Sequence, residues 1–139
     1  THPKMSKPSA EEIEEELKSS VAAIENVTGQ KVKLFRPPFG DYDDKVITVA
    51  ENLGLYTIQW NVDSLDWKNL SAEQIAARVI KKAGSGAIIL MHNNGLHTAE
   101  SLPLIFTATQ QKGLVYRPIS ELIYTDDFRI TPDGTQIKN

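Results

Sequence analysis

The chain has 139 residues and a formal net charge of -3, with basic side chains scattered along it, so it offers no basic surface to a nucleic acid. It has no apolar run long enough to cross a membrane, and the absence of cysteine excludes disulfides and thiolate metal sites. The length is sufficient for one hydrophobic core; the first residues do not form a secretion signal, and any export signal is expected upstream of them.

The beginning of the chain predicts a helix followed by a strand. Ser9 to Glu12 has the sequence of a capping box, and apolar residues then recur at helical spacing until Gly29. Residues 32–35 form a short stretch of alternating apolar character that ends before two prolines, which cannot donate ladder hydrogen bonds. We therefore expect an amphipathic helix and then a short strand.

Two further helices with a strand between them are expected in the middle of the chain. Asp43 can cap a helix that stops before Gly54. Residues 55–60 predict a buried strand, and Ser71 with Gln74 predicts the capping box of a third helix.

The same alternation continues after a Gly-Ser-Gly turn. Residues 87–91 predict a strand, and Thr98 can cap a fourth helix. Residues 115–116 are expected to form the last strand and residues 118–124 a short helix. Four strands separated by helices predict a parallel sheet with right-handed crossovers.

Three segments with chemically useful side chains each follow a predicted strand. They are Arg36-Pro37-Pro38-Phe39-Gly40, Asp63-Ser64-Leu65-Asp66-Trp67 and Ile88-Ile89-Leu90-Met91-His92. Because the carboxyl ends of parallel strands meet at one edge of a sheet, we expect these side chains to converge on one rim, where such folds place active sites.

His92 is a candidate general acid, because histidine gives and takes a proton most easily near neutral pH. Asp66 is its natural partner, since a carboxylate on one ring nitrogen fixes the tautomer and favours the protonated ring. Two alternatives stay open. His92 could be a loop histidine bonded to a backbone carbonyl, and Asp63 and Asp66 could be a loop pair that caps the following helix.

The other candidates also have structural alternatives. Arg36 precedes two prolines that stiffen its loop, so its guanidinium could orient a carboxylate, or it could form a weak surface salt bridge. Trp67 could line a pocket or simply fill core. His2 has the position of a solvated terminal residue, and His97 lies in a loop that we expect to be exposed.

These segments resemble motifs of the polysaccharide deacetylase family, the NodB-homology domain of carbohydrate esterase family four. The family motifs are Arg-Pro-Pro-Phe/Tyr-Gly, Asp-x-x-Asp-Trp and Leu-x-His. Thr1-His2-Pro3 resembles the end of a fourth motif, His-Ser/Thr-x-x-His-Pro, in which His2 would be the second metal-binding histidine. The resemblance runs from Thr1 to about Glu121, and the family's first motif, Thr-Phe-Asp-Asp-Gly, is not found in this sequence.

The resemblance implies an α/β fold, namely the C-terminal part of a distorted (β/α) barrel of the NodB-homology type. Residues 1–125 would form this partial domain, without its N-terminal part, and residues 126–139 a polar C-terminal tail. Asp133-Gly134 predicts a turn or small hairpin in that tail. A closed barrel usually needs about 250 residues, so we expect only part of a barrel here.

By the resemblance, the intact protein would remove the acetyl group from N-acetylhexosamine residues of a cell-wall polysaccharide, peptidoglycan or a chitin-like polymer. A divalent metal, zinc or a similar ion, would polarise the acetyl carbonyl, and an aspartate of the first motif would deprotonate the attacking water. Arg36 would pair with that aspartate, and the Phe39 N–H would stabilise the oxyanion. His92, tuned by Asp66, would protonate the leaving amine.

The resemblance also implies binding residues. Trp67, Leu90 and Pro38 would line the substrate pocket, with an apolar wall against the acetyl methyl group. His2 would bind the metal in a site that is incomplete in this chain, because its expected partners are not in the sequence. Residues 92–103 resemble those of bacterial members, including spore-associated ones, which favours peptidoglycan.

The implied location is extracellular or cell-wall associated in a bacterium. The implied partner is a polysaccharide, with no nucleic acid and no membrane span, and a complementary N-terminal segment or a second copy could cover the open sheet edge. Two alternatives to an enzyme remain: a catalytically dead carbohydrate-binding protein, and a structural half-barrel.

Overall fold

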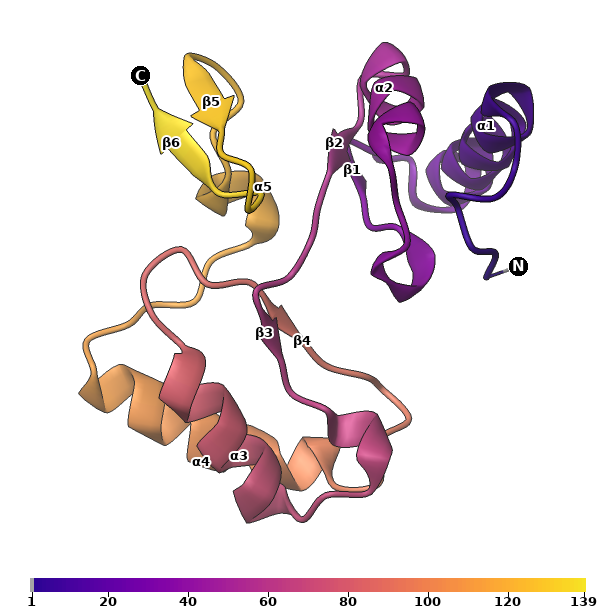
Figure 1. Ribbon diagram of the computed structural model, residues 1–139. Helices are drawn as coiled ribbons and strands as arrows, with labels where there is room; N and C mark the ends of the chain where they lie inside the picture. The colour runs from indigo at the N-terminus through magenta and orange to yellow at the C-terminus, as the bar shows by residue number, and fades with distance from the viewer. Residues whose placement is uncertain (1) are drawn as a thin grey trace. The chain divides into compact units, whose positions relative to one another are not determined.

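The computed structural model describes residues 2–139, which form two compact units, one that runs to Gln59 and one from Trp60 to Asn139 (Figure 1). Each unit contains one pair of parallel strands connected through a helix. Each also has its own cluster of buried apolar side chains.

The first unit is a helix followed by a strand, helix, strand arrangement. Its elements are α1 (Ala10–Thr28), β1 (Leu34–Phe35), the 3-10 turn η1 (Pro38–Gly40), α2 (Asp44–Asn52) and β2 (Tyr56–Thr57). β1 pairs in parallel with β2, with Leu34 opposite Tyr56 and Phe35 opposite Thr57. The loop with the Arg-Pro-Pro-Phe-Gly sequence therefore leaves the carboxyl end of a parallel strand, as predicted.

Local signals in the sequence set the ends of these helices. The Ser9 hydroxyl accepts from the Glu12 N–H at 3.2 Å, and the Glu12 carboxylate accepts from the Ser9 N–H at 2.8 Å. Gly29 takes a left-handed conformation (φ 68°) just after α1, and Asp43 caps α2 through the Val46 N–H. The predicted helices are confirmed. Their apolar faces meet in a core made of Met5, Ile13, Leu17, Val46, Ala50 and Leu55.

The second unit repeats the parallel pairing. Its elements are β3 (Val62–Asp63), the 3-10 turn η2 (Asp66–Lys68), α3 (Ala72–Lys82), β4 (Ile89–Leu90), α4 (Thr98–Gln111), α5 (Ile119–Leu122), β5 (Phe128–Ile130) and β6 (Gln136–Lys138). β3 pairs in parallel with β4, with Val62 opposite Ile89 and Asp63 opposite Leu90. The fully buried cluster that joins this pair to α3 and α4 consists of Val62, Ile75, Ala76, Val79 and Ile105.

The predicted hairpin in the tail is also confirmed. β5 and β6 pair antiparallel, with Arg129 opposite Ile137, and Gly134 adopts a positive φ of 84° in the turn between them. Within residues 2–139, no helix has the length and apolar character needed to span a bilayer.

Two expectations about the elements are wrong. Residues 115–116 do not form a strand, because Tyr116 folds back on α4, where its hydroxyl bonds Thr109 at 2.9 Å and its ring meets Phe106 edge-on. Thr98 does not cap α4 but is its first residue, and its hydroxyl is used elsewhere. β3 was not foreseen, because the sequence predicts one strand over residues 55–60, whereas the structure has β2 and then, after a break, β3.

Candidate active site

Asp66 and His92 are in direct contact in the second unit. Asp66 begins the η2 turn after β3, and His92 follows β4 by two residues, so the parallel pairing of these strands brings the two side chains to one edge. Asp66 Oδ1 lies 2.7 Å from His92 Nδ1, and Asp66 Oδ2 accepts from the backbone N–H of His92 at 2.7 Å. The Asp66 side chain is fully buried, whereas that of His92 is 36% exposed. A buried carboxylate thus anchors a histidine that solvent can reach.

The structural alternatives for His92 and Asp66, a bond to a backbone carbonyl and a helix-capping pair, do not match their contacts. The His92 ring bonds a carboxylate rather than a backbone carbonyl. It is Asp63 that makes a local loop bond, because its Oδ1 accepts from the Leu65 N–H at 2.9 Å. Leu65 itself has a positive φ of 54°, an uncommon conformation for a residue with a branched side chain, and it directs the chain into the turn that carries Asp66.

Thr98 also binds Asp66, which sequence reasoning missed. Its hydroxyl donates to Asp66 Oδ2 at 2.7 Å. The sequence shows a hydroxyl residue at a helix start, where capping is the ordinary role, and the contact links residues 32 positions apart. Only the folded arrangement of η2 and α4 distinguishes the two roles.

The Asp66 carboxyl is held in its ionised form. Burial is the largest single effect and disfavours the charge, but hydrogen bonds from the His92 N–H, the His92 ring and the Thr98 hydroxyl together outweigh it and lower the pKa of Asp66 below its usual value. An ionised Asp66 can only accept, so the proton of the shared hydrogen bond belongs to His92 Nδ1. His92 Nε2 is then the ring nitrogen that remains for an outside group, as a general acid requires.

Trp67 and Leu90 flank this pair in the sequence and differ in burial. Leu90 is buried in β4, whereas Trp67 is 55% exposed, and the Lys68 ammonium lies 5.0 Å from the centre of its ring. A core role for Trp67 does not fit that exposure. Its predicted place in a substrate pocket stays a prediction.

Phe39 and His2 are in contact in the first unit. Their rings meet edge-on with centroids 4.6 Å apart. Phe39 has a positive φ of 59°, and its side chain is 64% exposed, while Pro37 before it is buried. Among residues 2–139 the Phe39 N–H meets no acceptor. The expected role of the Phe39 N–H at an oxyanion stays a prediction.

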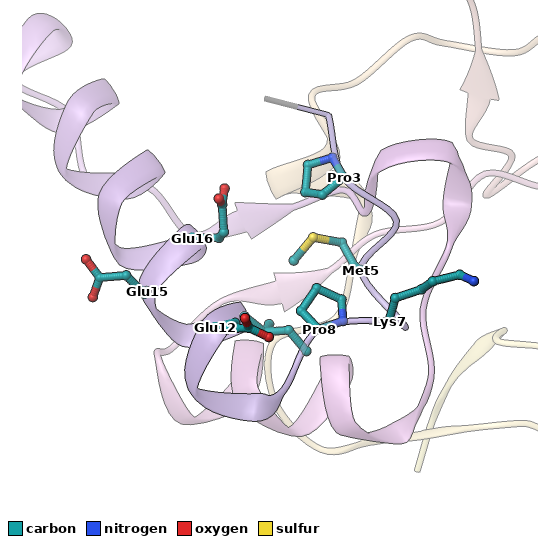
Figure 2. Close-up of a pocket in the computed structure, with 8 residues that line it drawn as sticks. Pro3, Met5, Lys7, Pro8, Glu12, Glu15 and Glu16 are labelled. Atoms are coloured by element: carbon teal, nitrogen blue, oxygen red, sulfur yellow. The ribbon is translucent and has the colours of Figure 1, made fainter.

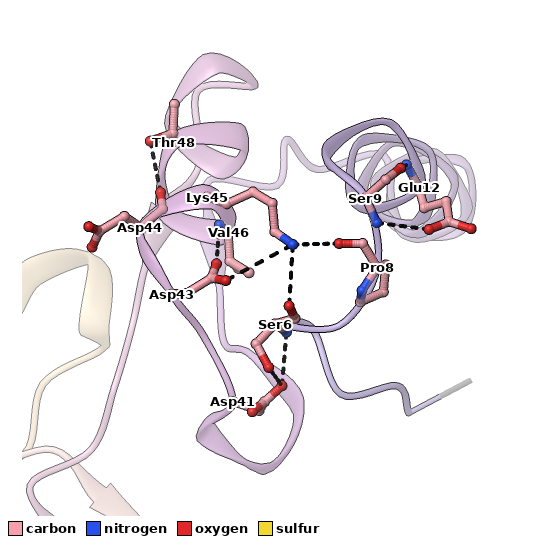
Figure 3. Close-up of polar contacts among 10 residues, drawn as sticks. All are labelled: Ser6, Pro8, Ser9, Glu12, Asp41, Asp43, Asp44, Lys45, Val46 and Thr48. Carbon is pink, nitrogen blue, oxygen red and sulfur yellow. Dashed lines mark hydrogen bonds and ion pairs between the residues drawn. The ribbon is translucent and has the colours of Figure 1, made fainter.

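A set of polar contacts ties the segment after His2 to the same loop (Figure 3). Asp41 Oδ2 accepts from the Ser6 N–H at 2.9 Å and from the Ser6 hydroxyl at 2.8 Å, and these bonds lower the pKa of Asp41. The Lys45 ammonium donates to the carbonyls of Ser6 and Pro8 at 3.2 and 2.6 Å. Residues 6–8 are therefore held against the region that follows η1.

Arg36 and Pro38 lie in the same loop as Phe39, and their contacts do not decide their roles. Arg36 is exposed and makes no ion pair with any of residues 2–139, and Pro38 is half-buried at the start of η1. The expected roles of both residues stay predictions.

The residues present do not fit a complete metal site. Residues 2–139 contain no group of three His, Cys, Asp or Glu side chains placed to hold a metal ion. The side chain of His97 is 42% exposed, as expected, and its Nδ1 lies 2.8 Å from Glu100 Oε2. The expected role of His2 as a metal ligand stays a prediction.

The first unit has an open hollow beside α1 (Figure 2). It is lined by Pro3, Met5, Lys7, Pro8, Glu12, Ile13, Glu15 and Glu16. Its walls combine apolar side chains with carboxylates from α1, and none of the predicted site residues lines it.

Comparisons with known proteins agree with the motifs. Residues 1–58 match the family model described as polysaccharide deacetylase. The chain is 36% identical over 121 residues to the peptidoglycan-N-acetylglucosamine deacetylase PgdA of Listeria monocytogenes, a match that covers 87% of this chain and 25% of PgdA. It spans 38% of another curated relative, the uncharacterized Bacillus subtilis protein YlxY, so it corresponds to well under half of these proteins.

Solved structures share the fold. A carbohydrate esterase family 4 pseudoenzyme from Bacillus anthracis is 38% identical, with a TM-score of 0.84 over 88% of this chain and 43% of that protein. A family 4 carbohydrate esterase from Streptomyces lividans, solved in complex with acetate, is 34% identical, with a TM-score of 0.80 over 86% of this chain and 62% of that protein.

The ionised state of Asp66 gives a prediction for stability. Asp66→Asn replaces an oxygen that accepts hydrogen bonds by an NH2 group that cannot, so we expect a loss of about 1.5 to 3 kcal/mol in the free energy of unfolding at pH 7. A carboxyl with a lowered pKa in the folded state stabilises the fold above its unfolded pKa, about 4, and loses this effect as the pH falls through the folded value. The difference between wild type and variant should therefore shrink below pH 4.

Urea unfolding of this chain between pH 7 and pH 3 measures that difference. Asp126→Asn, at an exposed carboxylate that lies 3.7 Å from Lys138, is the matched control and should change the free energy of unfolding by about 0.5 kcal/mol or less. A loss for Asp66→Asn that is the same at every pH would contradict an ionised Asp66.

Proposed function

The chain belongs to the polysaccharide deacetylase family and forms part of its NodB-type (β/α) barrel, and we propose that the protein that contains it hydrolyses acetyl groups from N-acetylhexosamine residues of a cell-wall polysaccharide. The observation that carries the proposal is the contact between the buried Asp66 and the accessible His92 at the ends of β3 and β4. A family resemblance alone would not distinguish a working site from a remnant.

In this proposal His92 protonates the leaving amine. Cleavage of an amide expels a nitrogen that must receive a proton as its bond to carbon breaks, and a histidine positioned at that nitrogen supplies it. Asp66 accepts from Nδ1, which keeps the ring in one orientation and stabilises its positive charge before transfer from Nε2. The two residues act as one acid.

Phe39 and Arg36, both in the first unit, have two further roles in this proposal. The Phe39 N–H would donate to the oxygen that becomes negative as water adds to the carbonyl, and the lack of an acceptor for it among residues 2–139 supports this role. Arg36 would orient the carboxylate that serves as base, which the family resemblance assigns to the Thr-Phe-Asp-Asp-Gly motif. The substrate acetyl group would contact Trp67, Leu90 and Pro38, and the exposure of Trp67 supports its part in this.

The family is generally metal-dependent, and a divalent metal, zinc, is part of the proposal for the intact protein. It would polarise the acetyl carbonyl, and His2 would be one of its ligands. Since residues 2–139 supply no complete ligand group, the other ligands would have to come from elsewhere.

Peptidoglycan is the proposed substrate and the cell wall the proposed location, with support from the name of PgdA, a peptidoglycan-N-acetylglucosamine deacetylase. A second candidate function is carbohydrate binding without catalysis. The similarity to a Bacillus anthracis pseudoenzyme and the lack of a ligand group within residues 2–139 favour it. The two candidates differ in whether acetate is released.

His92→Ala should remove most deacetylation in the intact protein. General acid catalysis typically contributes about 100- to 10,000-fold, and the loss should fall in turnover rather than in KM. Acetate released from N-acetylglucosamine oligomers measures the rate. His97→Ala, a surface histidine in the same loop, is the control and should keep its activity. Near-normal turnover of His92→Ala would rule out the assignment.

Trp67→Phe should leave the melting temperature of the intact protein close to normal and lower turnover, because the acetyl group loses part of an apolar wall. If the ring only filled core, Trp67→Ala would cost about 3 to 5 kcal/mol and activity would fall in step with stability. Melting temperature and turnover of both variants separate these outcomes, and a parallel loss of both quantities would refute the pocket role.

The 139-residue chain should bind zinc weakly or not at all, because a zinc site needs at least three protein ligands and residues 2–139 contain no such group. Titration calorimetry of the metal-free chain with zinc tests this. A one-to-one site with submicromolar Kd that disappears in His2→Ala would contradict it and would place a working metal site in this part of the protein.

A further inference from the structure

We propose that Thr98 and Gly95 are positioning residues for the Asp66–His92 pair: the Thr98 hydroxyl locks the carboxylate that aims the histidine, and Gly95 leaves the space that this hydroxyl occupies. The proposal rests on the proposed function of His92. It adds one residue of the loop after β4 and the first residue of α4, and both act on the reaction only through Asp66.

The Thr98 hydroxyl is available to Asp66 because it does not cap its own helix. The residue at the N-cap of α4 is His97, whose side chain makes no capping bond. Thr98, one position later, donates to Asp66 Oδ2 at 2.7 Å instead. A threonine at a helix start usually contributes through capping, so its use on a distant buried carboxylate indicates a requirement at that carboxylate.

The geometry of the carboxylate explains what this bond does. His92 uses both oxygens of Asp66, Oδ1 through its ring and Oδ2 through its backbone N–H, each at 2.7 Å. Thr98 adds a second donor to Oδ2. With Oδ2 held from two directions, rotation of the carboxylate is blocked, and Oδ1 stays directed at His92 Nδ1.

Thr98 is itself held rigidly. The buried Ser101 donates from its hydroxyl to the Thr98 carbonyl at 2.7 Å, and α4 is anchored by the fully buried Ile105 in the core of the unit. The hydroxyl therefore comes from a fixed helix end, as precise positioning of a catalytic side chain requires.

Gly95 is required here for space. Its φ lies outside the left-handed region, so the backbone does not need glycine. A Cβ at this position would lie 2.2 Å from Thr98 Oγ1 and 3.4 Å from Asp66 Oδ2. Since no two such atoms approach to 2.2 Å, any side chain at residue 95 must displace the Thr98 hydroxyl from the carboxylate.

Two substitutions should therefore cause the same defect by different routes. In the intact protein, Thr98→Val removes the hydroxyl with little change of shape, and Gly95→Ala displaces it. Each should lower turnover on N-acetylglucosamine oligomers about tenfold with KM nearly unchanged, the effect of one hydrogen bond to a charged group. The double variant should be no worse than either single one, because both remove one bond. Thr98→Ser should keep most of the activity.

The matched control is Thr109→Val. Thr109 is a buried threonine of the same helix, and its hydroxyl bonds the Ile105 carbonyl at 2.8 Å. This variant should lose stability to a similar degree as Thr98→Val but keep its turnover per folded molecule. Equal turnover losses in both, or additive losses in the Gly95→Ala and Thr98→Val double variant, would overturn the proposal.

Nitrogen NMR of the His92 ring tests the positioning without any activity. The wild type should show one tautomer with the proton on Nδ1, and Thr98→Val and Gly95→Ala should both show faster exchange of that proton with water, about tenfold. Unchanged exchange in both variants would overturn the positioning role. Changed exchange in a protein that releases no acetate would keep the positioning role and reject the proposed function.

Discussion

The arrangement of the second unit depends on one buried charge. Asp66 is fully removed from solvent, and an unpaired carboxylate in that place would be very unfavourable. Its oxygens are satisfied by three donors from two segments, the loop after β4 and the first residue of α4. The same bonds that make the charge tolerable also fix the His92 ring, to which we assign the proton transfer, so in this proposal stability and chemistry share one set of contacts.

In the first unit, the candidate residues are held in place by the backbone of one loop. These residues lie on a loop made rigid by prolines, with Phe39 in a left-handed conformation and its N–H without an acceptor among residues 2–139. Asp41 and Lys45 bond residues 6–8, and these bonds hold the segment after His2 against the region that follows η1. Backbone geometry, rather than a buried charge, is the constraint in this unit.

The sequence predicted much of this, and the misses have physical reasons. Helix starts followed from local signals, as with the capping boxes at Ser9 and Ser71, because capping depends on residues three positions apart. The contact of Asp66 with His92 followed from their positions after successive strands. Thr98 was given a capping role because its true partner is 32 residues away, and the space at Gly95 exists only in the folded chain.

The most direct test of His92 as the acid compares two leaving groups in the intact protein. An amine must be protonated as it leaves, whereas the phenolate of an activated acetyl ester leaves without a proton. If the Asp66–His92 pair serves the leaving group, His92→Ala should slow amide hydrolysis by about 100-fold or more and ester hydrolysis only a few-fold. Equal losses on the amide and the ester would contradict that role.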